Sequence, residues 1–513
     1  MTMVLQAQIN APRTQFLDAS GALLAGGSVT TYIPGTFTPI TTYIDADGSI
    51  ANDNPATLDA LGSVSIWADG LVRLIVKDAL GNLIYDQVGG SIVPMATTPF
   101  KVYPRPHSAP LQDRLASIIN LKTDYGCKGN NIDNDAPLIQ QAVDEAEVGD
   151  FPIAIYCPPG LYATESTITV NKPITFIGDG PRNAAWTPRG NFDVLAITGN
   201  STLRAANAGM RHIGVNAISM SGGRVFKLDM TQDCLFDDVL VSGAYNFMSI
   251  RQSGSIRMPS LQCFGVRGSY GLKAYGTQAS RNGGIDRCDV LEIGHLHVEG
   301  SFTPGTPGGE ATELFIIDGA VDTISYKTIR LLSGGRGARL SNTPGVNSEY
   351  VPGFALGGSF EVENTYLESI RLEACKAFNP RNLFCATSVS ENGIYMGSQA
   401  SNVRIGAGQA SNHWKNAIYI DGAQRVSIND FEAFYNGRYS SEVFSGAYVN
   451  AGDDIVFNGG LFGKNTSISE YVEYQKYGID NFGGTNVRAS ATNTRGNVTG
   501  GRHGVITADS LCI

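Results

Sequence analysis

The feature that most constrains this chain is a repeat. An eight-residue window with apolar or small residues at positions 1, 3, 6 and 8 recurs with starts at 208, 234, 261, 291, 324, 365, 398, 426 and 455, in steps of 26 to 41 residues. A second short strand recurs between windows, as in Gly393–Met396 and Ala417–Ile420. Strands with alternating apolar residues cannot bury their apolar face alone, so consecutive copies must stack. The repeat predicts an all-β solenoid, a parallel β-helix.

Composition agrees with a turn-rich β protein. Glycine accounts for 61 of 513 residues, while charged residues make up only 16% of the chain. A β-sandwich or a propeller with coincidental spacing is the alternative. Propeller blades would need about 40 to 50 residues each and a more even period. The 41-residue step from 324 to 365 is the longest, and surface insertions on a rigid stack are common places for binding sites.

The chain divides into unlike parts. Turn signals are dense over residues 1–98, which predicts a small antiparallel β domain. Five prolines between Pro94 and Pro110 predict an extended linker over 99–118. The β-helix is expected over 119–490, with an amphipathic helix at 135–148 capping its open apolar end. A short C-terminal segment, 491–513, follows.

Charge and cysteine usage exclude several function classes. A net charge of −10 gives no field to hold a phosphate backbone, so no nucleic-acid partner is expected. No apolar run is long enough for a membrane span and no secretory signal is visible, which predicts a protein made in the cytoplasm without membrane insertion. The eight cysteines form no C-x-x-C pair, so we expect buried free thiols. His295 and His297 lack a third ligand, and neither a metal nor another cofactor is predicted.

Several motifs resemble known phage proteins. The segments Asp124–Ala142, Tyr156–Tyr162 and Ile177–Gly180 resemble the opening landmarks of the pectate-lyase-like right-handed β-helix family of bacteriophage tailspikes, although Cys127, Asn130 and Asn131 depart from its pattern. A second group resembles the virion-binding amino-terminal domain of tailspikes and tail fibres: Phe16–Asp18, Gly26–Gly27, Tyr32–Thr36 and Ile84–Gln87.

The resemblance implies a homotrimer on the virion tail. Its amino-terminal domain would bind the virion or tail proteins, and its right-handed β-helix would bind, and often cleave, a bacterial surface polysaccharide outside the host cell. Only about fifty residues follow the last predicted coil, so a large C-terminal trimer clamp is not expected and the β-helix faces would hold the trimer together.

Glycoside cleavage requires two carboxylates, which on stacked coils must lie on one outer face. In the window at 291, His297 points outward and Glu299 follows it. The window alignment then places Arg330, Arg371 and Glu373 beside them, with Glu299 and Glu373 in one column two coils apart. We predict these two glutamates as catalytic and the three basic residues as substrate-binding. The alternative is a solvated ladder of salt bridges.

Three further acids and three tyrosines are candidates. Asp318 ends a recurring strand, and Glu361 and Glu363 alternate outward within the longest step, so any of the three could be catalytic. Tyr275, Tyr395 and Tyr419 occupy outward positions of the recurring strand, where aromatic faces could stack on sugars. Packing beneath loops or a neighbouring subunit is the alternative for the tyrosines.

The sequence therefore predicts a tailspike that binds and depolymerises a bacterial polysaccharide (lipopolysaccharide O-antigen, capsule or exopolysaccharide) by carboxylate-pair hydrolysis. A receptor-binding adhesin without catalysis and a polysaccharide lyase remain as alternatives. Fold alone cannot choose among them, because one scaffold hosts several activities.

Overall fold

The computed structural model divides into two units, 1–117 and 118–513. It describes residues 14–18, 20–45, 47–68, 72–89, 99–100, 109–110, 118–146, 153–200, 204–276, 288–303, 309–342, 354–440, 442–464 and 474–508. Most of the predicted linker, the Asp69–Gly70 turn and residues 509–513 therefore lie outside the described residues. No described helix is both long and apolar enough to cross a bilayer.

The first unit contains a four-stranded antiparallel sheet of order β3-β2-β5-β6 and the antiparallel pair β1–β4. The β5–β6 hairpin turns where the sequence predicts it, with the Asp78 carboxylate accepting the N–H groups of Leu80 and Asn82. The core of the first unit includes Val29, Val72 and Val76. The strand bounds are β1 (Thr14–Gln15), β2 (Ser28–Tyr32), β3 (Ala56–Thr57), β4 (Ser63–Val64), β5 (Val72–Lys77), β6 (Leu83–Gly89), β7 (Pro99–Phe100) and β8 (Ala109–Pro110).

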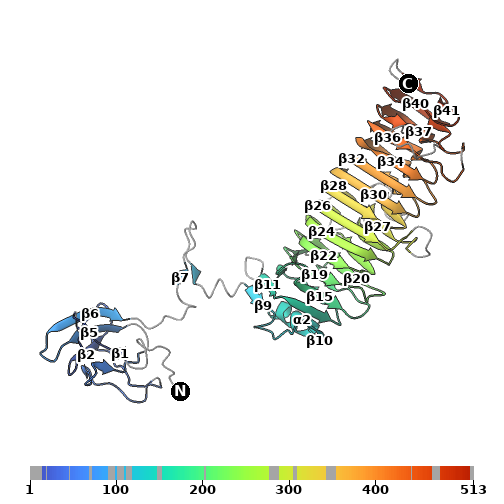
Figure 1. Cartoon of the computed structure of the whole chain (residues 1–513). Helices are drawn as coiled ribbons and strands as arrows, with labels where there is room; N and C mark the ends of the chain where they lie inside the picture. Colours follow the sequence, from blue (N-terminus) through green and yellow to red (C-terminus); the bar gives the residue numbers. More distant parts are fainter. Residues whose placement is uncertain are drawn as a thin grey trace. The chain divides into compact units, whose positions relative to one another are not determined.

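The second unit is a right-handed parallel β-helix, as the sequence predicts, and Figure 1 shows its strands stacked in chain order from cyan to red. One face, which we call the first sheet, has seventeen strands. They are β9 (Ile118–Asn120), β10 (Asn130–Asn134), β11 (Ile153–Cys157), β12 (Gly160–Thr164), β14 (Ile174–Gly178), β15 (Ala184–Pro188), β18 (Gly209–Arg211), β19 (Gly214–Asn216), β22 (Leu235–Ser242), β24 (Ile256–Val266), β26 (Cys288–Gly300), β28 (Val321–Leu332), β30 (Phe354–Thr365), β32 (Ala377–Ser388), β34 (Ala407–His413), β36 (Phe431–Phe434) and β38 (Leu461–Phe462).

The other long face, the second sheet, has fifteen strands. They are β13 (Ile168–Val170), β16 (Leu195–Thr198), β20 (Arg224–Asp229), β23 (Asn246–Arg251), β25 (Tyr270–Gly276), β27 (Glu313–Gly319), β29 (Arg336–Ser341), β31 (Ile370–Cys375), β33 (Ile394–Ile405), β35 (Ile418–Asn429), β37 (Ala447–Asn458), β39 (Tyr477–Asn481), β40 (Gly484–Ser490), β41 (Gly500–His503) and β42 (Thr507–Ala508). A short parallel pair joins β17 (Ala205–Ala206) to β21 (Thr231–Gln232).

The predicted capping helix is α2 (Ala136–Glu145), which buries Ile139, Ala142 and Val143 against the first coil. Asp135, just before the helix, is buried, and its carboxylate accepts the N–H groups of Lys128 and Gly129. At the other end the winding continues past the predicted limit of 490, because β40 pairs with β42 in parallel. The seven cysteines of the described residues are free and buried.

The strand register corrects the predicted repeat between 324 and 365. Windows up to 324 lie in the first sheet, whereas those at 365 and 398 fall mainly on second-sheet strands, and those at 426 and 455 begin in the second sheet and end on β36 and β38 of the first. The true partner of Ile329 is Phe360 on β30, and Phe360 in turn pairs with Leu383. These steps are 31 and 23 residues, so the 41-residue step does not exist. Both sheets bury alternate residues in the same way, and the apolar pattern of the window therefore cannot distinguish a first-sheet strand from a second-sheet strand.

Candidate functional site

Five predicted site residues gather on the outer face of the first sheet, and we call them the acid cluster: His297, Glu299, Arg330, Glu361 and Glu363. His297 pairs in register with Arg330, and Arg330 with Glu361. Their neighbours Glu299, Leu332 and Glu363 form the adjacent column. Each points outward because the intervening Val298, Leu331 and Val362 are fully buried in the core.

The acid cluster raises the pKa of one of its carboxyls. The pKa of Glu363 is raised, first by burial, then by its hydrogen bond with Glu361 and by the negative charge of Glu361. Arg330 opposes this shift, and its Nε lies 3.1 Å from Glu361 Oε1. Adjacent carboxyls that share a site cannot both ionise without mutual repulsion. The arrangement therefore stabilises the protonated form of Glu363.

Glu299 completes the cluster from two strands away. Two strand spacings of about 4.8 Å separate its backbone from that of Glu363, about 9.6 Å in total. His297 Nε2 lies 3.9 Å from Glu299 Oε2. Burial and nearby Arg330 and His295 lower the pKa of His297, so at neutral pH its imidazole is uncharged. Among the residues that the structure describes, no other basic side chain forms an ion pair with Glu299.

Glu373 and Arg371 do not belong to this face, and the predicted column of Glu299 with Glu373 is wrong. Both lie on β31 in the second sheet, where Arg371 pairs in register with Arg339 and Tyr395. The misplaced window at 365 produced the error, because it put a second-sheet strand in line with first-sheet strands. The first-sheet residue two coils after Glu299 is Glu363.

On the second sheet, six residues form an arginine network: Glu313, Arg336, Arg339, Glu368, Arg371 and Glu373. Arg371 contacts Glu373 at 2.6 Å and Glu368 at 2.7 Å, and Arg339 lies 3.9 Å from Glu373. The cations lower the pKa of the buried Glu368 despite its burial. This is the salt-bridge ladder that the sequence offered as an alternative, and its ionised carboxylates are poor proton donors.

Three tyrosines continue this column as a ladder of stacked rings: Tyr395, Tyr419 and Tyr448. Tyr395 and Tyr419 are 5.8 Å apart between ring centroids, and Tyr419 and Tyr448 are 5.5 Å apart, with nearly parallel planes. Arg371 covers the other face of Tyr395 at 4.2 Å. Because Arg371 and Tyr419 cover the two faces of Tyr395, and Tyr395 and Tyr448 cover those of Tyr419, only the edges and hydroxyls of these two rings remain for a sugar.

The two remaining candidates occupy a different column of the second sheet. Tyr275 pairs with Asp318, two residues along from the column of Tyr395. The Asp318 carboxylate accepts a hydrogen bond from the Ser341 hydroxyl at 3.0 Å. Tyr275 has Lys273 over its ring at 5.0 Å. Neither residue approaches the acid cluster in register, because both lie on the second sheet.

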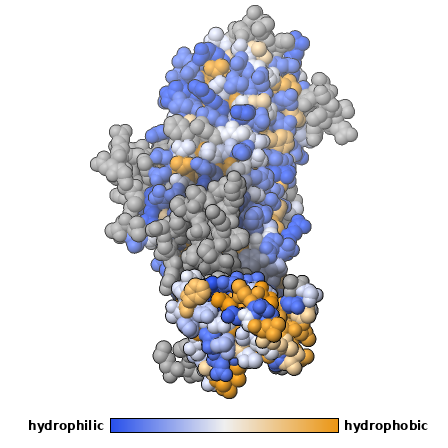
Figure 2. Space-filling view, turned by 90° about the vertical axis from the view of Figure 1, so that its left-hand side faces the viewer, coloured by the Kyte–Doolittle hydropathy of each residue, from blue (hydrophilic) through white to orange (hydrophobic). Residues whose placement is uncertain are grey.

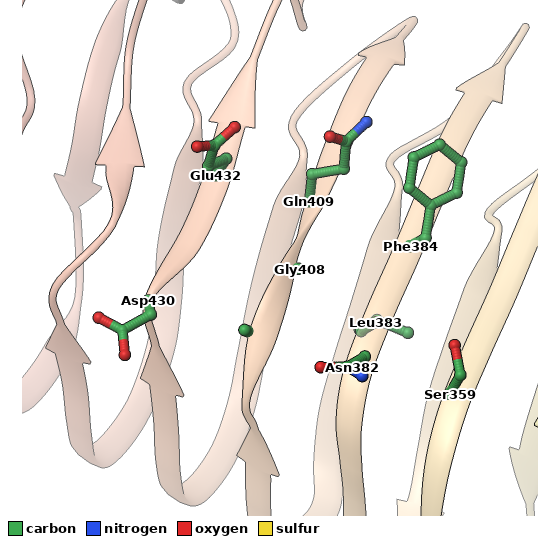
Figure 3. Close-up of a pocket in the computed structure, with 9 residues that line it drawn as sticks. Ser359, Asn382, Leu383, Phe384, Gly408, Gln409, Asp430 and Glu432 are labelled. Carbon is green, nitrogen blue, oxygen red and sulfur yellow. The ribbon is translucent and has the colours of Figure 1, made fainter. Parts of the chain in front are cut away.

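A hollow of about 450 Å³ adjoins the acid cluster on the first sheet, and sequence reasoning missed it. We call it the polar hollow. Its lining, eight residues of which are labelled in Figure 3, is Ser359, Asn382, Leu383, Phe384, Ala407, Gly408, Gln409, Asp430 and Glu432. Ser359 lies on β30, the strand of Glu361 and Glu363, and Phe384 on the next strand pairs in register with Glu361, so the hollow begins beside the carboxyl pair. The correct register would have revealed it as a column of polar and aromatic outward residues.

Within the described ranges, no group of three or more His, Cys, Asp or Glu side chains is placed to hold a metal ion. The His295 and His297 pair accordingly gains no third ligand among the residues the structure covers.

Comparison with known proteins supports the pectate-lyase-like resemblance predicted from the motifs. Residues 118–238 match the family model described as "Rhamnogalacturonase A/epimerase, pectate lyase-like". No curated protein sequence matches the chain. The solved structures similar to it include phage tailspike proteins and polysaccharide-acting enzymes.

Three solved structures illustrate the range. Tailspike protein 3 of bacteriophage CBA120 is 13% identical, with 82% of this chain and 66% of that chain covered and a TM-score of 0.49. The A-module of a mannuronan C-5 epimerase from Azotobacter vinelandii is 13% identical, with coverages of 76% and 97% and a TM-score of 0.47. The catalytic domain of an α-1,3-glucanase is 11% identical, with coverages of 96% and 80% and a TM-score of 0.37.

Proposed function

We propose that this protein is a phage tailspike that hydrolyses a glycosidic bond in a bacterial surface polysaccharide at the acid cluster. One observation carries the proposal: Glu363, whose pKa is raised, and Glu299, two strands away, lie in the same outward column. A glycosidase needs one protonated and one ionised carboxyl facing the substrate, and in this proposal Glu363 takes the first role and Glu299 the second.

The backbone spacing of about 9.6 Å between the two glutamates is closer to the range for an inverting reaction than to that for a retaining one. Inverting glycosidases hold their carboxyls about 6.5 to 9.5 Å apart, which leaves room for water, whereas retaining ones hold them about 5 to 5.5 Å apart. Glu363 would donate its proton to the glycosidic oxygen as the bond from that oxygen to the anomeric carbon breaks. Glu299 would take a proton from a water that attacks the anomeric carbon from the opposite side.

Glu361 and Arg330 act as positioning residues in this scheme. Ionised Glu361 makes ionisation of Glu363 costly, which keeps the proton on the acid until the substrate takes it. Arg330 holds Glu361 in place through their ion pair. Because Glu361 and Glu363 are in hydrogen-bonding contact, they are too close to accommodate a water between them, and Glu299 is the better base.

The proposal includes attachment to the virion through the first unit. Of the nineteen large apolar side chains exposed in the described residues, nine lie between Leu17 and Leu83, far more than the share of the chain that this stretch represents. Figure 2 shows apolar side chains gathered on one face of this small domain. Such surfaces on soluble domains mark protein–protein contacts. In this proposal the protein is a homotrimer on the virion tail that acts outside the host cell.

A panel of purified bacterial surface polysaccharides, incubated with the full-length protein, tests the proposal through mass analysis of the products. We expect hydrolysed fragments with new reducing ends, and nuclear magnetic resonance should show inversion at the new anomeric centre. Retention would remove Glu299 as the base. Unsaturated products absorbing in the ultraviolet would instead identify a lyase, and binding without fragments would identify an adhesin.

A further inference from the structure

The polar hollow presents hydrogen-bonding groups that the protein itself does not use. In Figure 3, Phe384, Gln409 and Glu432 project from successive strands, with Asn382 and Asp430 along a second row. Among the described residues, the side chains of Asn382, Asp430 and Glu432 have no hydrogen-bond partner. This contrasts with the arginine network, whose carboxylates are bound by guanidinium groups.

Local sequence explains why the surface is hollowed here. Ala407 replaces the longer Asn382 of the preceding strand in register, and Gly408 follows it without a side chain. A Cβ at Gly408 would collide with the carbonyl of Leu383, and its φ of +152° is one that other residues rarely adopt. The floor at Ala407 and Gly408 is therefore low, between Asn382 on one side and Asp430 on the other, and the row of Phe384, Gln409 and Glu432 rises beside it.

Phe384 offers what the tyrosine ladder does not. Figure 3 shows its ring standing out from the sheet with one face toward the viewer, and no described aromatic ring or cation packs on it. Flat aromatic faces contact the apolar C–H faces of sugar rings, while the surrounding amides and carboxylates accept hydrogen bonds from hydroxyls. The combination suits one or two pyranose rings lying along the strands β32, β34 and β36.

The charge of the hollow selects among sugars. Two carboxylates line it and no lysine or arginine does. Arg381 precedes Asn382 on the strand but is not part of the lining, and Arg330, two strands before Phe384, is paired with Glu361. A uronic acid or a phosphorylated sugar would place a negative charge beside Asp430 and Glu432. Like charges that lie next to each other in a partly desolvated site repel.

We propose that the polar hollow binds the sugar on the leaving-group side of the cleaved bond, and that this sugar is uncharged. Its position rests on the proposed function: with Glu299 activating water and Glu363 protonating the glycosidic oxygen, the departing sugar extends away from Glu299, toward Phe384. The carboxylates and amides accept hydrogen bonds from the hydroxyl groups of this sugar, and the ring of Phe384 packs against one face of it.

Saturation-transfer nuclear magnetic resonance on the full-length protein tests the inference without knowledge of the natural polymer. The probes are methyl glycosides of glucose, galactose, rhamnose and N-acetylglucosamine, together with those of glucuronic and galacturonic acid. At least one neutral glycoside should show transfer that Phe384→Ala abolishes. The uronates should show transfer at least about threefold weaker, and Glu432→Gln should reduce that difference. Glu292→Gln, which removes an exposed charge elsewhere on the first sheet, should not reduce it.

Two results would overturn the inference. One is equal or stronger transfer to the uronates in the unchanged protein, because the hollow would then not discriminate by charge. The other is the lack of any neutral glycoside whose signal depends on Phe384. Failure of the proposed function looks different: the glycosides would still bind in a Phe384-dependent way, but no polysaccharide in the panel would be hydrolysed.

Discussion

Acidification should destabilise the β-helix through His413, which is fully buried at the end of β34. Its Nδ1 accepts a hydrogen bond from the backbone N–H of Ser388 at 3.2 Å and lies 3.1 Å from the Ser388 hydroxyl. Burial lowers the pKa of His413 to about 3. A proton on Nδ1 would face the Ser388 N–H instead of accepting from it, so the folded protein keeps the imidazole neutral.

The size of the effect follows from the difference between folded and unfolded states. An unfolded histidine has a pKa near 6.5, so the unfolded chain takes up the proton first as the pH falls. The stability that neutral His413 contributes is complete above about pH 6.5 and is lost progressively between there and pH 3. At pH 5 the loss is about 2 kcal/mol. For a unit of about 400 residues, this lowers the Tm by roughly 2 to 3 °C.

The assay compares thermal unfolding of the unchanged protein and of His413→Asn at pH 7 and pH 5. Asparagine keeps an acceptor near the Ser388 N–H but cannot be protonated in this range. Carboxyl groups that titrate over the same interval contribute equally to both proteins and cancel in the comparison. We expect the unchanged protein to lose about 2 to 3 °C more than the variant. Equal losses would refute the reasoning, because His413 would then not be held neutral.

Three further outcomes are expected. Glu363→Gln and Glu299→Gln should each lower kcat by about 10²- to 10⁴-fold, whereas Glu373→Gln, on the other sheet, should stay within about threefold; an equal loss in all three would refute the assignment to the first sheet. In the pH profile of kcat, the fall at high pH should have a pKa above that of an ordinary glutamate, since Glu363 must stay protonated. Glu361→Gln should move this fall to lower pH, and a profile without a fall at high pH would contradict the assignment. Tyr419→Ala should lower the Tm without changing oligosaccharide affinity, because its ring faces are already covered; weaker binding would show that the tyrosines contact substrate.

The sequence was sufficient to predict the β-helix and the side chains that point outward. It was not sufficient to predict which residues of successive coils lie in register. Alternation of buried residues decides that Glu299, Glu361 and Glu363 face solvent, and it depends only on neighbours along one strand. Register across coils depends on how many residues each turn contains, which varies from 35 between Leu261 and Leu296 to 23 between Phe360 and Leu383. Apolar periodicity does not reveal the number of residues in each turn, and Glu373 was therefore aligned with the wrong sheet.

The register also explains why the two sheets differ chemically. On the second sheet, guanidinium groups stand in register with one another, as Arg339 does with Arg371, and each attracts carboxylates from adjacent strands until every described acid of the network is paired. On the first sheet, Arg330 stands alone in its column between a neutral His297 and Glu361, and it can neutralise only one of three glutamates. The excess of acid over base there adds to burial in raising the pKa of Glu363. A single added cation would remove that excess: Leu332→Arg, between Glu299 and Glu363 in the same column, should lower the pKa of Glu363 and abolish cleavage while the fold persists.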